Sequence, residues 1–315
     1  MRMNVVIIGL GNIGMCYDLK TKDITSHAKA FSLHKNFYLS AGVDLNSKKR
    51  FLFEKKYLKP AYKNLTICLK KTRPDIIVIS TPAKNHLTII KKIFKNYSPK
   101  VILCEKPLGI NFEQCLKIDS LCKKFKTKLF VNYIRLSDPG IIKIKQKIQS
   151  GFIQNTRIGF VFYSKGMLNN ASHFLNTLEY WFGDIVNIKL IKRGKRINNY
   201  DFEHSFKVYF HKVTVYFFPC LDSDSFANSM QLNAKNGSLF YGVGGKYVFW
   251  QKKIKLSKTP SKYNINCQQL FTGKNNSQMH FVNNLYFVLK NKKHNICHGG
   301  TALKTLKKIH SLNEK

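Results

Sequence analysis

Three glycines near the start of the chain, Gly9, Gly11 and Gly14, follow a β-branched apolar run at residues 5–8 in the spacing G-x-G-x-x-G. A glycine turn between a strand and a helix lets the backbone approach a pyrophosphate closely, and the N–H groups that open the helix attract its charge. This feature predicts a dinucleotide-binding βαβ unit. The rival interpretation is a glycine turn that binds no ligand.

Strand-like and helix-like segments alternate over the first third of the chain. Apolar runs occur at residues 38–43, 75–80, 101–104 and 129–132, and helical spacing occurs at residues 65–71, 86–97 and 112–125. Such alternation, with strands that are apolar throughout, is typical of a parallel sheet with helices on both faces. We therefore predict a doubly wound Rossmann domain over residues 1–128.

The pattern changes beyond residue 128. Runs rich in Tyr and Phe at residues 206–218 and 238–250 predict longer strands of a mostly antiparallel sheet, and helical spacing recurs at residues 173–182, 279–289 and 302–312. The predicted fold class is α/β, with an N-terminal Rossmann domain and a C-terminal α+β domain that has an open sheet over residues 129–315. The last helices can pack back toward the first domain.

Asp44 ends the second predicted strand, where a carboxylate can accept a hydrogen bond from a ribose 2′-hydroxyl. It lies 44 − 14 = 30 residues after Gly14, against about 20 in a compact fingerprint, and this surplus predicts an insertion around residues 17–25. The carboxylate favours NAD over NADP because it repels a 2′-phosphate. NADP stays an alternative cofactor, because the basic run at residues 48–50 offers partners for that phosphate.

Two further segments fall at predicted strand ends. Thr81 and Pro82 close one run, and Glu105, Lys106 and Pro107 follow the next. Open parallel sheets bind ligands at the carboxyl ends of their strands, so we expect Lys106 beside a bound nicotinamide as a proton donor or acceptor. The rival interpretations are a plain strand stop and a solvated surface lysine.

Together these residues resemble the glucose-fructose oxidoreductase / inositol dehydrogenase / rhizopine catabolism (Gfo/Idh/MocA) family. The resemblance is carried by the glycine fingerprint, Asp44, Ser80-Thr81-Pro82 with His86, Cys104-Glu105-Lys106-Pro107-Leu108, Asn132-Tyr133 with Arg135, Asn170-Ala171-Ser172-His173, and residues 280–284. It implies an NAD(P)-dependent oxidoreductase that transfers a hydride between nicotinamide and a carbinol carbon of a sugar, cyclitol or nucleotide-sugar.

The resemblance also implies roles for single residues. Lys106 would hydrogen-bond the reacting hydroxyl, and His173 would serve as acid and base from a helix of the second domain. Carboxylates commonly stand four residues before that histidine and three residues after it, where this chain has Asn169 and Asn176. An amide cannot accept a proton as a carboxylate does. A catalytically inactive NAD(P)-binding sensor or regulator of the same fold is therefore the alternative function.

The candidate site has three sets of residues. The expected cofactor-binding residues are Gly9, Gly11, Asn12, Ile13, Gly14, Asp44, Thr81, Pro82, His86, Glu105 and Lys106. The expected catalytic residues are Lys106, His173 and Asn169, and the expected substrate-binding residues are Lys106, Tyr133, Arg135, Asn169 and His173. A guanidinium such as that of Arg135 is suited to pair with a phosphate or carboxylate of the substrate.

The charge of the chain is unusual. Its 315 residues include 54 Lys and Arg against 16 Asp and Glu, a formal net charge of +38. An anionic nucleotide-sugar or a nucleic acid would suit such a charge. The basic residues are mostly lysines spread along a chain rich in Asn, Ile, Phe and Tyr, a mixture that AT-rich codons also produce. Because no helix-turn-helix, RNA-recognition or zinc-finger pattern occurs, we predict no specific nucleic-acid partner.

The sequence contains no C-x-x-C, H-E-x-x-H or G-x-S-x-G motif, so we predict no metal site and no disulfide framework. No run approaches the roughly 18 apolar residues of a membrane span, and no secretory signal is apparent. We expect a cytoplasmic protein with reduced thiols, a small-molecule substrate and no membrane partner. The family resemblance implies a homodimer or homotetramer formed through the open sheet.

Overall fold

The computed structural model describes residues 2–253 and 267–312, and the chain divides into two compact units. The first unit comprises Met1–Ser137 and Asn275–Lys304, and the second comprises Asp138–Lys274 and Thr305–Lys315. The expected boundary at residue 128 falls inside the first unit, because the chain adds one more parallel strand to the first sheet before it leaves. A later segment also returns to the first unit.

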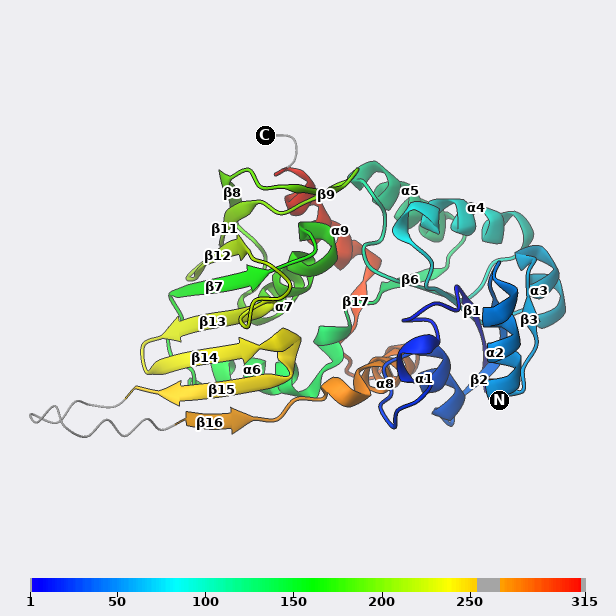
Figure 1. Cartoon of the computed structure of the whole chain (residues 1–315), viewed down its shortest axis with the longest axis horizontal. Helices are drawn as coiled ribbons and strands as arrows, with labels where there is room; N and C mark the ends of the chain where they lie inside the picture. The colour runs from blue at the N-terminus through cyan, green and yellow to red at the C-terminus, as the bar shows by residue number, and fades with distance from the viewer. Residues whose placement is uncertain (1, 254–266, 313–315) are drawn as a thin grey trace, which may run out of the picture. The chain divides into compact units, whose positions relative to one another are not determined.

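The first unit is built on a seven-stranded sheet in the order β17-β6-β5-β4-β1-β2-β3 (Figure 1). Its strands are β1 (Met3–Ile8), β2 (Phe37–Val43), β3 (Ala61–Tyr62), β4 (Ile76–Ile79), β5 (Val101–Cys104), β6 (Lys128–Val131) and β17 (Cys297–His298). Neighbouring strands run parallel except β17, which pairs antiparallel with β6. The strand order reverses between β1 and β4, which confirms the predicted doubly wound sheet.

Six helices accompany this sheet. They are α1 (His27–Leu33), α2 (Ser47–Tyr57), α3 (Leu65–Thr72), α4 (His86–Asn96), α5 (Phe112–Lys124) and α8 (Ser277–Leu289). The side chains of Asn46, Asn64 and Asn111 cap α2, α3 and α5 by accepting backbone N–H groups. The sequence pattern does not reveal α2, because Phe53 is the one buried residue in its eleven and no apolar stripe results.

The helix that follows the glycine turn is interrupted. After the 3-10 turn Cys16–Asp18, residues 19–26 leave the helical path, and the helix then resumes as α1. His27 N donates to Ile13 O at 3.0 Å and Ala28 N donates to Gly14 O at 2.9 Å, so α1 continues the first turn across the gap. This arrangement confirms the insertion that the spacing of the glycines and Asp44 predicts.

The inserted loop is closed by the buried carboxylate of Asp18. It accepts hydrogen bonds from Thr25 N and Ser26 N, each at 2.7 Å, and from the Ser26 hydroxyl at 2.6 Å. The ammonium of Lys29 adds a contact to Thr21 O at 2.6 Å. These bonds bring the two ends of the loop together, and α1 can therefore start in register with the glycine turn.

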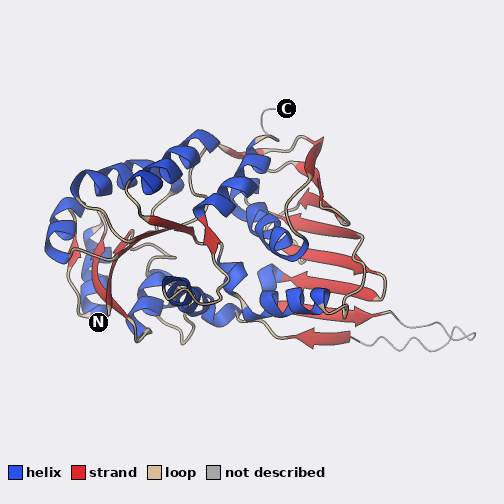
Figure 2. Ribbon diagram, turned by 180° about the vertical axis from the view of Figure 1, so that it is seen from behind, coloured by secondary structure: helices blue, strands red, loops and turns tan. Residues whose placement is uncertain are grey.

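The second unit contains an eight-stranded sheet in the order β16-β15-β14-β13-β7-β12-β11-β8, and its helices lie on one face in both views (Figure 1, Figure 2). Its strands are β7 (Ile158–Tyr163), β8 (Asn187–Lys192), β11 (Ser205–Tyr209), β12 (Thr214–Pro219), β13 (Ser229–Ala234), β14 (Gly237–Gly242), β15 (Tyr247–Lys252) and β16 (Cys267–Leu270). All neighbours run antiparallel except β7 and β12. This confirms the predicted open, mostly antiparallel sheet.

Smaller elements complete the second unit. They are the hairpin strands β9 (Arg196–Asn198) and β10 (Asp201–Phe202), and the helices α6 (Pro139–Gln149) and α7 (Ser172–Phe182). The division between the two units falls within α9 (Gly299–His310). Among the helices of residues 2–253 and 267–312, none is long and apolar enough to cross a membrane.

The long strands predicted over residues 206–218 and 238–250 are wrong in one respect, because each is a hairpin. β11 and β12 are joined by a tight turn in which Phe210 N donates to Val213 O at 2.8 Å, and β14 and β15 are joined by a turn with two left-handed glycines, Gly244 and Gly245. Apolar residues flank both turns. In the first turn only His211 and Lys212 separate the apolar runs, whereas the Gly-Gly pair of the second turn is a turn signal in the sequence.

Candidate functional site

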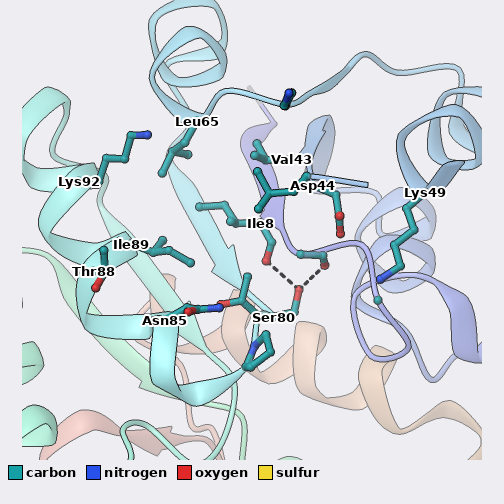
Figure 3. Close-up of a pocket in the computed structure, with 16 residues that line it drawn as sticks. Ile8, Val43, Asp44, Lys49, Leu65, Ser80, Asn85, Thr88, Ile89 and Lys92 are labelled. Atoms are coloured by element: carbon teal, nitrogen blue, oxygen red, sulfur yellow. Dashed lines mark hydrogen bonds between the residues drawn. The ribbon is translucent and has the colours of Figure 1, made fainter. Parts of the chain in front are cut away.

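A pocket of about 710 Å³ opens at the carboxyl ends of β1, β2 and β4 in the first unit (Figure 3). Here the strand order reverses, and open parallel sheets bind ligands at such a switch point. The volume lies within the range of about 300–1,000 Å³ that is usual for small-molecule and cofactor sites.

Five of the predicted cofactor-binding residues line the pocket: Gly9, Gly11, Asp44, Thr81 and Pro82. Six others lie outside its lining: Asn12, Ile13, Gly14, His86, Glu105 and Lys106. The pocket therefore covers the glycine turn and the acidic end of β2, and the turn after β5 lies two strands from β1.

The three positions of the fingerprint require glycine for different structural reasons. A Cβ on Gly9, whose φ is +95°, would lie 2.7 Å from Ser80 O, and a Cβ on Gly14 would lie 2.0 Å from Gly9 O. Both positions thus exclude a side chain because backbone approaches backbone. At Gly11 the nearest atom to an added Cβ is Lys49 Nζ, at 3.8 Å. Gly11 therefore leaves room for a ligand, which is the role that the fingerprint predicts for it.

The carboxylate of Asp44 is held in place by backbone groups. Oδ2 accepts a hydrogen bond from Leu10 N and Oδ1 accepts one from Asn46 N, each at 2.8 Å. Figure 3 shows Asp44 and Lys49 on the same side of the pocket. In the basic run 48–50, the Arg50 guanidinium donates to two main-chain carbonyls, and Lys49 lines the pocket.

The hydroxyl of Thr81 offers a polar group to a ligand. Thr81 Oγ1 is buried and has no hydrogen-bond partner among residues 2–253 and 267–312, although its residue lines the pocket. The preceding Ser80 hydroxyl donates inward instead, toward Gly9 O at 2.7 Å and Ile8 O at 3.1 Å (Figure 3). A buried hydroxyl is rarely left without a partner, so a bound polar molecule would satisfy Thr81. The open glycine and this hydroxyl both fit a dinucleotide.

His86 is buried, and both of its ring nitrogens contact protein groups. Nε2 lies 2.8 Å from Thr81 O, and Nδ1 lies 3.2 Å from Cys104 Sγ. Burial lowers the pKa of His86 and raises the pKa of the Cys104 thiol. Nδ1 also lies 3.1 Å from Leu108 O, so each ring nitrogen faces a main-chain carbonyl. His86 thus joins the turn after β4 to the end of β5.

Glu105 is buried, and its carboxylate faces protein groups. Oε1 lies 2.7 Å from His27 Nε2 and accepts from Asn132 Nδ2 at 2.6 Å, and Oε2 accepts from Lys106 N at 3.3 Å. No local sequence pattern sets His27 apart from the other histidines of the chain. Its partner lies 78 residues away along the chain, and no local signal connects the two.

In the second unit, the segment that carries Asn169 is a π-helical turn, Met167–Ala171, directly before α7. His173 lies in the first turn of α7 and is half-buried, and Asn176 is buried. Single π-helical turns occur often at functional sites. The predicted catalytic residues of this unit therefore share one continuous helical segment.

Two buried carboxylates contact the start of that segment. Asp201 accepts hydrogen bonds from Leu168 N at 2.9 Å and from Asn169 N at 3.1 Å, and Glu203 accepts one from Gly166 N at 3.3 Å. Burial raises the pKa of Asp201 to about 6. Sequence reasoning missed both residues, because they lie in and after the hairpin strand β10, more than thirty residues away.

The two expected substrate-binding residues of the first unit follow β6. Tyr133 is buried, and Arg135 lies half-buried in the 3-10 turn Ile134–Ser137. Lys63 and Lys92 also line the pocket and were not predicted. Nothing in the local sequence distinguishes these two lysines from the many others in the chain.

Known proteins share both the sequence and the fold of this site. Residues 3–133 match the Gfo/Idh/MocA family model, described as an oxidoreductase family with an NAD-binding Rossmann fold. This segment of the chain is thus similar to the NAD-binding Rossmann domain of that family. Myo-inositol 2-dehydrogenase of Thermotoga maritima is 26% identical over 152 residues, which are 48% of this chain and 42% of that protein. The rhizopine catabolism protein MocA of Rhizobium meliloti is 30% identical over 81 residues, which are 26% of this chain and 25% of that protein. Each alignment thus spans less than half of the curated relative.

Solved structures extend the similarity of fold to the whole chain. The WlbA dehydrogenase of Bordetella pertussis, in complex with NADH and UDP-GlcNAcA, superposes with a TM-score of 0.76 over 99% of this chain and 95% of its own, at 13% identity. The aldose-aldose oxidoreductase of Caulobacter crescentus, complexed with glycerol, gives 0.77 over 100% and 97%, at 15% identity. At these identities the likeness concerns the fold alone.

Proposed function

We propose that this chain is an NAD(P)-dependent oxidoreductase that transfers a hydride between nicotinamide and a carbinol carbon of a sugar, cyclitol or nucleotide-sugar. The observation that carries the proposal is the pocket at the switch point between β1 and β4, with an open position at Gly11, the Asp44 carboxylate and the buried Thr81 hydroxyl. The matched relatives that are named as inositol dehydrogenases support an alcohol as substrate.

The bound nicotinamide would supply the hydride acceptor or donor, and the remaining chemistry falls to side chains. When the alcohol is oxidised, its hydroxyl proton must leave as the hydride departs from carbon. We assign the proton to the imidazole of His173 and the stabilisation of the developing alkoxide to the ammonium of Lys106. Lys106 lies in the turn after β5, next in the sheet to β4, whose end lines the pocket.

NAD is the proposed cofactor. Asp44 is held by two backbone N–H groups at the end of β2, where its carboxylate would accept from a ribose hydroxyl and repel a 2′-phosphate. NADP stays a second candidate, because the pocket-lining ammonium groups of Lys49 and Lys63 offer partners for that phosphate.

An anionic nucleotide-sugar is the substrate that best suits the net charge of +38, with Arg135 as a candidate partner for its phosphates. The substrate residues that we propose are Lys106, Tyr133, Arg135, Asn169 and His173. The proposed location is the cytoplasm.

The test is reduction of NAD and NADP, followed by nicotinamide absorbance, with myo-inositol, neutral aldoses and UDP- and dTDP-sugars as substrates. We expect turnover with at least one of these alcohols. Turnover with a neutral sugar and none with the nucleotide-sugars would remove the preference for an anionic substrate.

A dinucleotide sensor is the second candidate, and Asn169 and Asn176 favour it, because neither amide can act as a base. Such a protein would bind NAD(H) tightly in calorimetry and turn over none of the alcohols. It would also retain a protein partner in pull-down experiments.

We also propose a homodimer or homotetramer. One face of the second sheet carries half-buried aromatic side chains in adjacent strands, in which Phe160 faces Tyr216 and Phe162 faces Phe218. Contiguous apolar surface of this kind marks interaction sites. Native mass spectrometry should show two or four copies, and a purely monomeric spectrum would contradict the proposal.

A further inference from the structure

The turn that carries Lys106 is connected to the glycine turn by a continuous series of hydrogen bonds within the first unit. Ile13, inside the fingerprint, accepts from His27 N at 3.0 Å, and the His27 ring contacts Glu105 at 2.7 Å. Glu105 in turn accepts from Lys106 N at 3.3 Å. Because a carboxylate only accepts hydrogen bonds, His27 Nε2 carries the hydrogen.

The His27 and Asn132 side chains have no other hydrogen bond that explains their burial. His27 is 0% exposed and Asn132 is 2% exposed, yet His27 Nδ1 and Asn132 Oδ1 have no partner among residues 2–253 and 267–312. Burying polar side chains costs free energy unless their hydrogen bonds repay it. The remaining polar atom of each side chain, His27 Nε2 and Asn132 Nδ2, is hydrogen-bonded to Glu105 Oε1. The hydrogen bonds of both side chains therefore go to the Glu105 carboxylate.

These bonds keep Glu105 ionised. Burial acts to raise the pKa of this carboxyl, but the hydrogen bond and charge interaction with His27, the hydrogen bond from Asn132 and the positive charge of Lys106 outweigh it. The pKa therefore lies below its usual value. The other titratable groups near the carboxylate are His86 of α4 and Cys104 of β5. Of these, His86 is held neutral and Cys104 stays protonated. A buried carboxylate thus lies next to Lys106 in the chain and accepts from its backbone N–H.

We propose that His27 and Asn132 are positioning residues that hold Glu105 as a buried anion, and that this anion fixes the orientation and the protonation of Lys106. The proposal rests on the function proposed above for Lys106, and it assigns Glu105 to the support of that lysine instead of to cofactor contact. His27, the first residue of α1, also connects the two turns: its backbone N–H donates to Ile13 of the glycine turn, and its ring contacts Glu105 beside Lys106.

Three substitutions test separately the hydrogen bond from His27 and the negative charge of Glu105. His27→Leu removes the donor, His27→Gln keeps an amide donor at nearly the same reach, and Glu105→Gln removes the charge with little change in shape. We expect His27→Leu and Glu105→Gln to lower kcat at least about 10-fold while the Kd for NAD changes less than about 3-fold. His27→Gln should stay within about 3-fold of the wild-type kcat. His34→Leu, at the other end of α1, is the matched control and should keep full kcat.

A second measurement does not depend on turnover. Acetic anhydride labels amines only in their neutral form, so the pH at which Lys106 is half-labelled, read by peptide mass spectrometry against exposed Lys95, reports its protonation. Loss of a nearby anion disfavours the ammonium, so the half-labelling pH of Lys106 should fall by about 0.5 or more in Glu105→Gln. The same fall is expected in His27→Leu, and none in His27→Gln.

Equal half-labelling pH values in wild type, Glu105→Gln and His27→Leu would overturn the proposal, as would a wild-type kcat in Glu105→Gln. If His27→Leu does not fold, the other two variants still test the proposal. The half-labelling pH of Lys106 should fall in Glu105→Gln and should stay at the wild-type value in His27→Gln. A wild-type protein without turnover on any alcohol, but with the expected labelling shifts, would instead refute the proposed function and leave the role of Glu105 standing.

Discussion

The backbone N–H of Asn169 donates a hydrogen bond to the buried carboxylate of Asp201, with 3.1 Å between the nitrogen and Oδ2. Oδ1 of the same carboxylate accepts from Leu168 N at 2.9 Å. A Cβ on Gly166 would lie 2.1 Å from Oδ2, so the contact also explains the glycine before the π-helical turn. A carboxylate at the start of a helix is favourable because it satisfies N–H groups and opposes the helix dipole. Asp201 thus fixes where the segment that carries His173 begins.

Asp201 predicts a pH-dependent stability. Burial raises its folded-state pKa from 3.8 to about 6, so its contribution to the free energy of unfolding is fully present below about pH 3.8 and is lost as the pH rises through about 6. A shift of this size corresponds to roughly 3 kcal/mol at most. The stability of wild type relative to Asp201→Asn should therefore fall between about pH 4 and 6 and stay level above pH 7. Urea unfolding across this range measures it, and a difference independent of pH would contradict it.

Replacement of Lys106 by Met keeps the length of the side chain and removes its charge. If the ammonium stabilises a developing alkoxide, turnover should fall by about 100-fold or more, whereas the Kd for NAD should change less than about 3-fold because Lys106 lies outside the pocket lining. Lys117→Met, on the exposed face of α5, is the control. Unchanged turnover in Lys106→Met would exclude the assigned role.

Gly11 and Gly14 should respond differently to alanine. At Gly14 the new methyl would meet Gly9 O at 2.0 Å, so Gly14→Ala should lower the free energy of unfolding by about 1–3 kcal/mol or more. At Gly11 the nearest atom is a lysine end at 3.8 Å, so Gly11→Ala should unfold like the wild type. It should nevertheless lose at least about 10-fold in NAD affinity, because the methyl occupies the space of the pyrophosphate. Calorimetry measures both quantities, and normal NAD binding by Gly11→Ala would refute the placement of the cofactor.

Lys49 and Lys48 form a matched pair for testing cofactor preference. Lys49 lines the pocket and Lys48 does not. If Lys49 meets a 2′-phosphate, Lys49→Ala should weaken NADP binding about 10-fold and NAD binding less than about 3-fold, and Lys48→Ala should change neither. Equal losses of affinity for NAD and NADP would instead indicate that Lys49 contacts a phosphate that both cofactors have.

Much of the first unit can be read from the sequence, because each signal is local. β4 and β5 are buried on both faces and are apolar throughout, so short apolar runs mark them. The glycine turn can be read because backbone crowding at Gly9 and Gly14 excludes side chains. The number of residues between Gly14 and Asp44 is likewise known from the sequence, and its excess predicts the inserted loop.

Other features could not be read, because they depend on residues that meet only when the chain is folded. The reversal inside residues 206–218 lies between strands of similar apolar pattern. The pocket gains Lys63 and Lys92 from elements whose local sequence resembles every other lysine-rich helix or turn of this chain. His27 and Glu105 meet across 78 residues, and Asp201 and Asn169 meet across 32.

The order of residues along the chain thus determined where the backbone must turn tightly, which strands are buried on both faces and at which end of the sheet the pocket lies. Tertiary structure alone decided which buried polar groups face one another. The physical reason is that hydrophobic burial and backbone conformation leave a periodic record in the sequence, whereas a hydrogen bond between distant side chains requires only that folding bring two atoms within about 3 Å.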